Sequence, residues 1–277
     1  MNIDYKIRRP QAGRELYKNI FKNRDDTEIV QLISDGLLAV KNNVIRLMND
    51  VNLLIDADRY ASARFLSATA DEEMAKSYVL LDMCRLDFRK YESVLRCLCR
   101  AFYDHVIKHA YTQIHRFGRI HDLAQARKIW EVEITKWWPN YDPESGEPDM
   151  PHDTYFSREM PLYVDYIGYD QKWAIPSDKT ESLHFTETIG LDALSVSEKY
   201  LEIMKLTDNV GLFQPQSLSI MHDIFEKTYI KEDINNNDLI KFYQLIDERI
   251  NKELSISKET IFKTIYFGWP LYHFLTY

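Results

Sequence analysis

Glycine is scarce in this sequence, with 8 in 277 residues, well below the average of roughly 7%. This scarcity argues against a turn-rich all-β fold, and the chain holds neither a G-x-G-x-x-G string nor a P-loop string. The sequence also lacks a run of about 18 apolar residues and an apolar core in the leading MNIDYKIRRPQAG. We therefore expect a cytoplasmic protein that makes no contact with a membrane.

Cysteine is rare as well. Cys84, Cys97 and Cys99 are odd in number and fall within helical patterns, which is typical of a reducing compartment rather than a disulfide framework. A zinc site needs about four ligands at suitable spacing, and a Cys-x-Cys string alone does not supply them. We expect no bound metal and no cofactor.

Positive charge is in deficit overall but concentrated in one segment. The formal net charge is −8, and acidic chains are poor non-specific binders of nucleic acid. Between Arg85 and Lys128, however, ten Lys and Arg stand against four Asp and Glu, a local charge of +6 that leaves −14 for the remainder. Four of the eight histidines lie in the same segment. If the protein meets a phosphate backbone, we expect the contact here.

Apolar residues recur at spacings of three and four through the first half of the chain, which predicts helices. The clearest helix is expected from about Glu28 to Ile55, behind Asp25, Asp26 and Thr27 as candidate N-caps. Long helices joined by short connections predict an up-and-down four-helix bundle and a mainly all-α fold. The other helices are expected over Arg14–Lys22, Ala61–Cys84 or Asp87, Tyr91–Ile114 or Arg116, and His121–Trp137.

Composition changes after Trp138. The string PNYDPESGEPDMPHD holds four prolines and five acids, which predicts a loop. Residues 162–175 then alternate as a small β-hairpin that ends at Pro176. We therefore divide the chain into a bundle over 1–138, an acidic proline-rich loop with a β-hairpin over 139–188, and a helical region over 189–277. Helices in the last region are expected over Asp192–Leu206, Pro215–Thr228, Asn237–Glu253 and Ser257–Phe267.

The helix expected from Ala61 has a seam of mostly small residues, which lets a second helix approach closely. In its middle, Glu72 and Glu73 precede Lys76 by four and three residues, so either carboxylate can reach the ammonium. Two interpretations stay open: an ordinary surface pair worth roughly 0.3–0.5 kcal/mol, or a structural pair that orients the neighbouring Arg- and His-rich helix. The seam consists of Ala63, Ser67, Ala70, Met74, Ser77 and Leu81.

Three strings occur in the order typical of one known family. The first is DADRYASARFLSATADEEMAKSYVLL, the second is FYDHVIKH, and the third is REMPLYVDY followed by Trp173 and Pro176. Together they resemble the AbiV family of abortive-infection proteins, within the HEPN superfamily of four-helix, mostly prokaryotic proteins that target nucleic acids. The resemblance extends over roughly Thr27 to Pro176 and implies a HEPN-like bundle. Its markers are Asp58, Arg59, Tyr60, Ala63, Leu66, Ala70, Glu72, Glu73, Lys76, His105 and Lys108.

The resemblance implies an anti-phage effector that cleaves cellular RNA without a metal, the ribose 2′-OH attacking the adjacent phosphate. HEPN ribonucleases share an Arg followed by His after four to six residues, which Arg100 and His105 match here. His is suited to proton transfer near neutral pH, and the Arg fork suits a phosphate. We assign His105 as acid or base and Arg100 as the phosphate-stabilising residue. Supporting or RNA-binding roles are expected for Arg96, Tyr103, Asp104, Lys108 and His109, with Glu72, Glu73 and Lys76 behind them.

The expected partners are RNA, a second copy of the chain, and a phage-encoded activator or regulatory protein. On an ideal helix, five residues turn about 500°, which leaves Arg100 and His105 about 140° apart. The resemblance implies that a homodimer completes the site, with the motif helices facing across a two-fold axis.

A non-catalytic alternative stays open, in which the bundle only binds RNA or a phage or regulatory protein. The acidic net charge favours it, as does Ala101 after Arg100, where many active members carry a polar residue. In that case the acidic loop Asp142–Asp153 would be a docking segment. His105 would then be an ordinary structural histidine.

Overall fold

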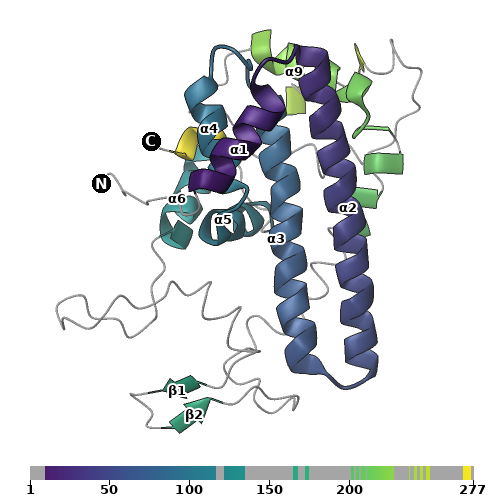
Figure 1. Cartoon of the computed structure of the whole chain (residues 1–277), viewed down its shortest axis with the longest axis vertical. Coiled ribbons are helices and arrows are strands. Elements are labelled where there is room, and N and C mark those ends of the chain that lie inside the picture. Colours follow the sequence, from purple (N-terminus) through teal and green to yellow (C-terminus); the bar gives the residue numbers. More distant parts are fainter. Residues whose placement is uncertain are drawn as a thin grey trace, which may run out of the picture.

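The computed structural model describes residues 10–116, 122–134, 165–167, 172–174, 211–227 and 271–275, with scattered positions from 201 to 249. These residues are mostly helical, which confirms the mainly all-α fold (Figure 1). The helices are α1 Pro10–Phe21, α2 Asp26–Asp56, α3 Tyr60–Cys84, α4 Glu92–Ala101, α5 His105–Arg116, α6 Leu123–Ile134, α9 Pro215–Lys227 and the 3₁₀ helix η3 Leu271–Phe274. The strands are β1 Asp165–Ile167 and β2 Lys172–Ala174.

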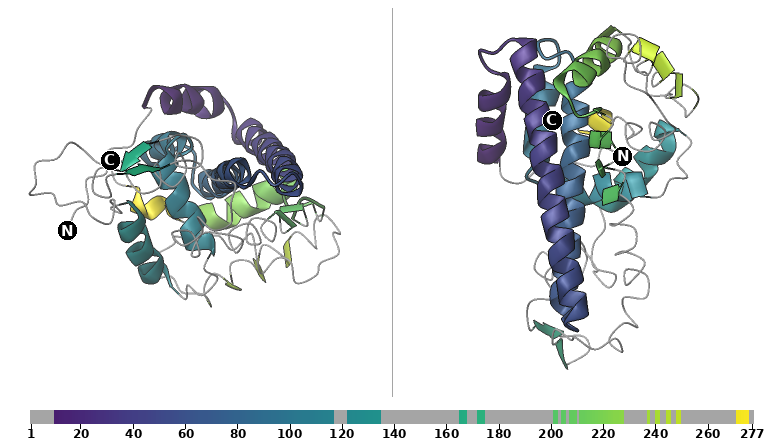
Figure 2. Two further views of the ribbon diagram at one scale, coloured as in Figure 1. Left: turned by 90° about the horizontal axis from the view of Figure 1, so that it is seen from below. Right: turned by 90° about the vertical axis from the view of Figure 1, so that its right-hand side faces the viewer.

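The long hairpin of α2 and α3 forms the spine of the fold (Figures 1 and 2). Asp25 caps α2 as predicted: its side chain accepts from the Glu28 N–H, and the Glu28 side chain accepts from the Asp25 N–H. The predicted small seam of α3 is buried, so the two helices pack closely along it. Its members are Ala63, Ser67, Ala70, Met74, Ser77 and Leu81.

The expectation of one long helix from Tyr91 to Ile114 or Arg116 is wrong. The chain forms two helices there, α4 and α5, separated by residues 102–104. The Tyr103 and Asp104 N–H groups donate to the carbonyls three residues earlier, each at 3.0 Å, which tightens the turn. Asp104 Oδ1 then accepts from the Ile107 N–H at 3.1 Å and caps the start of α5. The chain changes direction at this turn, and α5 crosses α3 (Figure 1).

Helix α1 packs against α4 at a glycine. A Cβ atom on Gly13 would lie 2.7 Å from Arg100 Cα and 2.8 Å from Arg100 N. Both atoms belong to the backbone, so they cannot move aside as a flexible side chain does. Glycine is therefore required at this crossing, and it sets where α1 lies over α4.

We expect Gly13→Ala to destabilise the protein relative to Gly36→Ala by about 1–3 kcal/mol, the usual cost of overpacking. The Cβ at position 36 would meet the two methyl groups of Leu80, Cδ1 at 3.2 Å and Cδ2 at 3.7 Å, which end a side chain. Both substitutions raise helix propensity by about 1 kcal/mol, so their difference isolates the clash. Urea unfolding measures it, and equal midpoints for the two variants would contradict the close approach at Gly13.

The C-terminal elements pack on the α2–α3 hairpin. Ser34 Oγ of α2 donates to the Phe213 carbonyl at 2.6 Å, and His222 Nδ1 of α9 lies 2.9 Å from the Cys84 carbonyl. The Leu271 N–H donates to Asp82 Oδ2 at 2.9 Å. The described part of the C-terminal region therefore shares one hydrophobic core with the bundle.

Two further predictions are confirmed. Helix α9 matches the helix expected over Pro215–Thr228, and β1 pairs antiparallel with β2 in the expected hairpin, Asp165 opposite Ala174. The acidic loop and the helix expected over Ser257–Phe267 lie outside the described residues, as do parts of those over Asp192–Leu206 and Asn237–Glu253. In the described part of the chain, every helix is too short or too polar to cross a membrane.

Candidate functional site

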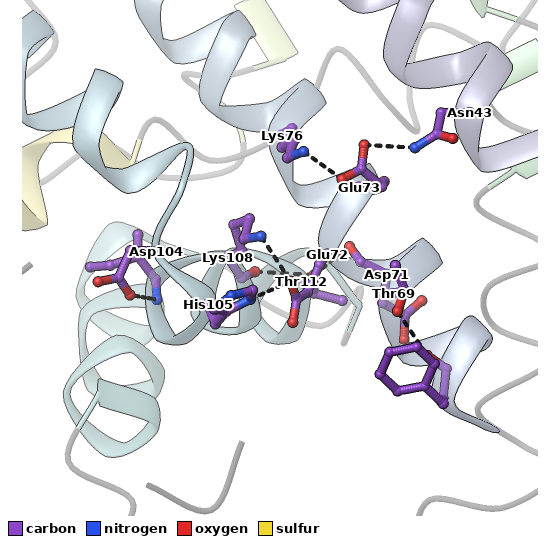
Figure 3. Close-up of polar contacts among 12 residues, drawn as sticks. Asn43, Thr69, Asp71, Glu72, Glu73, Lys76, Asp104, His105, Lys108 and Thr112 are labelled. Carbon is purple, nitrogen blue, oxygen red and sulfur yellow. Dashed lines mark hydrogen bonds and ion pairs between the residues drawn. The ribbon is translucent and has the colours of Figure 1, made fainter. Parts of the chain in front are cut away.

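Glu72 on α3 is the centre of a buried polar cluster (Figure 3). Its Oε2 atom lies 2.6 Å from His105 Nδ1 and accepts from Lys108 Nζ at 2.7 Å. Exposed fractions are 11% for the Glu72 side chain, 18% for His105 and 5% for Lys108. Because His105 and Lys108 are three residues apart on α5, one turn of that helix presents both to the same carboxylate. We call these three residues the Glu72 cluster.

The charge state of Glu72 follows from its partners. Burial raises the pKa of this carboxyl, but the hydrogen bond from His105 and the charge of Lys108 outweigh burial and lower the pKa to about 2. Glu72 is therefore ionised at neutral pH and can only accept hydrogen bonds. The proton between Glu72 and His105 must then sit on Nδ1 of the imidazole, which fixes the tautomer when the ring is neutral.

One contact with α3 and one cap fix the position of α5. Thr112 Oγ1 lies 3.1 Å from the Asp71 carbonyl, one residue before Glu72 in α3. Asp104, predicted to have a supporting or RNA-binding role, caps the first turn of α5 and is only 1% exposed. The beginning of α5, and with it His105, is thus fixed by a cap on one side and by α3 on the other.

The neighbouring acid has different partners. Glu73 forms an ion pair with Lys76, and its Oε2 accepts from Asn43 Nδ2 of α2 at 3.0 Å. Lys76 Nζ also lies 5.1 Å from the centroid of the Phe102 ring, in the turn before α5. The two glutamates of the family marker therefore diverge, Glu72 toward α5 and Glu73 toward α2 (Figure 3).

Arg100 is placed differently from His105. Its backbone packs against Gly13 of α1, and Nε is buried without a hydrogen-bond partner among the described residues. His105 begins the next helix and contacts α3. The joint action of these two residues on one phosphate stays a prediction.

Arg96 and Tyr103, predicted to have supporting or RNA-binding roles, contact neighbouring side chains. Arg96 forms an i,i+4 ion pair with Glu92 at the surface and lies over the Tyr17 ring, 4.1 Å from its centroid. Tyr103 packs edge-on against Phe102, with ring centroids 5.4 Å apart. Both residues stay candidates for RNA contact by virtue of position alone.

His109 contacts a carboxylate that the sequence analysis did not identify. Its Nε2 lies 3.1 Å from Glu133 Oε2 of α6, whose side chain is 11% exposed. Glu133 lies three and seven residues after Trp130 and Ala126, both buried, and so falls on the apolar face of α6. Glu133 could have been identified from the sequence, because it is an acidic residue at a position where the helical pattern of α6 is otherwise apolar.

The three cysteines form no disulfide and are buried, and burial raises the pKa of the Cys84 thiol to about 12. Nowhere in the described ranges do three His, Cys, Asp or Glu side chains gather in a group that could hold a metal ion.

The described cluster lies within a segment that matches a known family. The family model for AbiV proteins (HEPN_AbiV) matches residues 32–196, which is more than half of the 277-residue chain. No curated protein and no solved structure matches. The matched segment contains Glu72, His105, Lys108, His109 and Glu133, whereas α9 and η3 follow it in the chain.

Proposed function

Because the chain belongs to the AbiV family of HEPN proteins, we propose that it is an abortive-infection effector that cleaves cellular RNA and so arrests growth. The observation that carries the proposal is the contact between the Glu72 carboxylate and His105 Nδ1. A buried carboxylate that holds an imidazole by one nitrogen orients the ring and leaves Nε2 as the nitrogen for proton transfer.

The reaction is a transesterification that needs only proton transfer and charge stabilisation. His105 Nε2 takes the proton of a ribose 2′-OH, the 2′-oxygen attacks the adjacent phosphorus, and the 5′-oxygen leaves with a proton. The products are a 2′,3′-cyclic phosphate and a 5′-hydroxyl. Arg100 is the proposed cation for the phosphate oxygens. No metal takes part in any of these steps.

Because Lys108 balances the charge of Glu72, the net charge of the Glu72 cluster depends on whether the His105 imidazole is protonated. The Lys108 ammonium neutralises Glu72, so the Glu72 cluster is neutral when the imidazole is neutral and carries one positive charge when the imidazole is protonated. A site that alternates between these two states can take up and release one proton per cleavage. We include in the proposal a homodimer in which the motif helices of the two copies face each other across a two-fold axis.

The test uses purified protein and labelled single-stranded RNA. We expect His105→Asn to lower the cleavage rate by about 10²–10⁴-fold, the usual contribution of general acid–base catalysis. Asparagine keeps an N–H donor near the place of Nδ1, so the bond to Glu72 and the fold are retained while the titrating group is lost. The 2′,3′-cyclic phosphate product is followed by gel, and growth arrest is followed in cells.

Gln113→Ala is the matched control, since it shortens a half-buried polar residue of the same helix without removing a titrating group. A folded His105→Asn protein that cleaves RNA as fast as wild type would eliminate His105 as a catalyst.

The packing of Arg100 against α1 favours a second function, binding of RNA without cleavage. Wild-type protein that binds RNA and leaves it intact at every protein concentration would establish that function instead.

A further inference from the structure

We propose that His109 is a second catalytic residue, the acid that protonates the departing 5′-oxygen, and that Glu133 positions it. This inference rests on the proposed ribonuclease function and assigns a residue to its second proton transfer. The observation behind it is that α5 carries two histidines one turn apart, each against a buried glutamate from a different flanking helix.

The two histidines share the accessible side of α5. His105, His109 and Gln113 follow one another at intervals of four residues and are each partly exposed. The residues directly after each of the three, Val106, Ala110 and Ile114, are buried in the core. Side chains four apart on a helix have Cβ atoms about 5–6 Å from each other. A ligand that reaches His105 from solvent therefore meets His109 as its next neighbour on this helix.

The carboxylates flank the two rings from separate elements. Glu72 of α3 contacts Nδ1 of His105, and Glu133 of α6 contacts Nε2 of His109 at 3.1 Å. Each glutamate side chain is 11% exposed, while the His109 side chain is 27% exposed. Glu133 and His109 lie within ion-pair distance, whereas Glu72 and His105 also share a hydrogen bond. A buried carboxylate is costly unless a donor or cation satisfies it, so in this proposal Glu133 positions the His109 imidazolium through the attraction between their charges. The ring nitrogen of His109 left for substrate is Nδ1.

The reaction requires two proton-transfer groups, because the attacking 2′-oxygen and the departing 5′-oxygen lie on opposite sides of the phosphorus. The 2′-O–H bond breaks and its proton goes to His105 as the new bond to phosphorus forms. On the opposite side of the phosphorus, the bond to the 5′-oxygen breaks, and that oxygen takes a proton from the His109 imidazolium. The cycle ends with His105 protonated and His109 neutral, and proton exchange with water restores both. A single imidazole cannot reach both ends of this reaction at once.

A modified RNA isolates the second step. When sulfur replaces the bridging 5′-oxygen, the leaving group is a thiolate, which departs without a proton. We expect His109→Ala to lower cleavage of ordinary RNA by about 10²-fold and to leave cleavage of the sulfur-bridged RNA near the wild-type rate. His105→Asn is expected to slow both substrates, because the nucleophile is unchanged between them.

Two further variants complete the experiment. Glu133→Gln is expected to slow ordinary RNA less than His109→Ala does and to spare the sulfur-bridged RNA, as fits a positioning residue. Gln31→Ala, at an exposed position of α2, is the control and is expected to change neither rate. Equal losses on both substrates for His109→Ala, or no loss on either, would overturn the role of His109 while leaving ribonuclease activity intact. Wild-type protein that cleaves neither substrate would overturn the proposed function itself.

Discussion

Glu72→Gln is expected to destabilise the protein by about 3–5 kcal/mol, the usual result of removing one partner from a buried ion pair. The substitution keeps the shape of the side chain but leaves the Lys108 ammonium, 5% exposed, without a counter-charge. In a chain of this length the loss corresponds to a fall in the melting temperature on the order of 10 °C. Denaturant and thermal unfolding measure the change.

The size of the effect depends on burial, and this can be tested within the same protein. Glu92→Gln removes the acid of a surface pair in which the Glu92 and Arg96 side chains are 54% and 43% exposed. This change is expected to lower stability far less than Glu72→Gln does, because solvent screens the pair. Combining Glu72→Gln with Lys108→Met removes both buried charges and should recover most of the lost stability. A double variant no more stable than Glu72→Gln alone would show that the charge of Lys108 is not what makes the single change costly.

The same carboxylate gives the protein a defined sensitivity to acid. The pKa of Glu72 in the folded protein is about 2, below its ordinary value of 4.5, because His105 and Lys108 outweigh the effect of burial. A lowered pKa means that this stabilisation is fully present above about pH 5 and is lost as the pH falls from about 4.5 toward 2. The shift corresponds to a free energy on the order of 3 kcal/mol. Below pH 2 the stability difference between wild type and Glu72→Gln should therefore shrink.

Local sequence signals were sufficient for the α2–α3 hairpin. Asp25 and Glu28 form a capping box that can be read directly from their spacing, and the small seam of α3 is buried as its periodicity predicted. Such local signals could not predict which side chain pairs with Glu72. Spacing allowed both Glu72 and Glu73 to reach Lys76, and only the placement of α5 against α3 assigns Glu72 to His105.

The division of α4 from α5 was missed for a physical reason. The sequence between Arg100 and His105 contains neither proline nor glycine, and the helical spacing of apolar residues continues through it. The one local signal was Asp104, a good N-cap residue that also occurs within helices. Because the helix ends at Ala101, the 140° separation of Arg100 and His105 on an ideal helix does not apply.

Contacts between distant segments account for the rest. Gly13 and Arg100 meet because α1 crosses α4. The sequence placed Gly13 just before the helix expected over Arg14–Lys22, and a glycine in that position does not indicate a helix crossing. Asp82 contacts a residue 189 positions later in the chain. No pattern within α3 identifies that acid as the point where the C-terminal segment is attached.

Asp82→Asn is accordingly expected to destabilise the protein by about 3–5 kcal/mol and to loosen its C-terminal elements. The Asp82 carboxylate is fully buried and accepts from Arg85 at 2.7 Å, from the Tyr111 hydroxyl at 2.8 Å and from the Leu271 N–H at 2.9 Å. An amide oxygen cannot serve three donors as well as two carboxylate oxygens do, and its NH₂ group adds a donor that finds no acceptor in this arrangement. Unfolding midpoints measure the global loss, and hydrogen exchange at the Leu271 amide measures the local one.

Arg85 makes the loss larger than that of a hydrogen bond alone. Its side chain is 1% exposed and lies over the Phe225 ring of α9, 5.3 Å from the centroid, so its charge has no access to water once Asp82 is neutral. Asp50→Asn is the matched control, because Asp50 pairs with Arg46 at the surface, where the side chains are 43% and 62% exposed. If the two Asp→Asn variants unfold at the same denaturant concentration, the Asp82 contacts do not hold the C-terminal segment. If only Asp82→Asn unfolds early and exchanges its Leu271 amide faster, this carboxylate fastens η3 to the bundle, in addition to the contacts that Ser34 and Cys84 make with the C-terminal region.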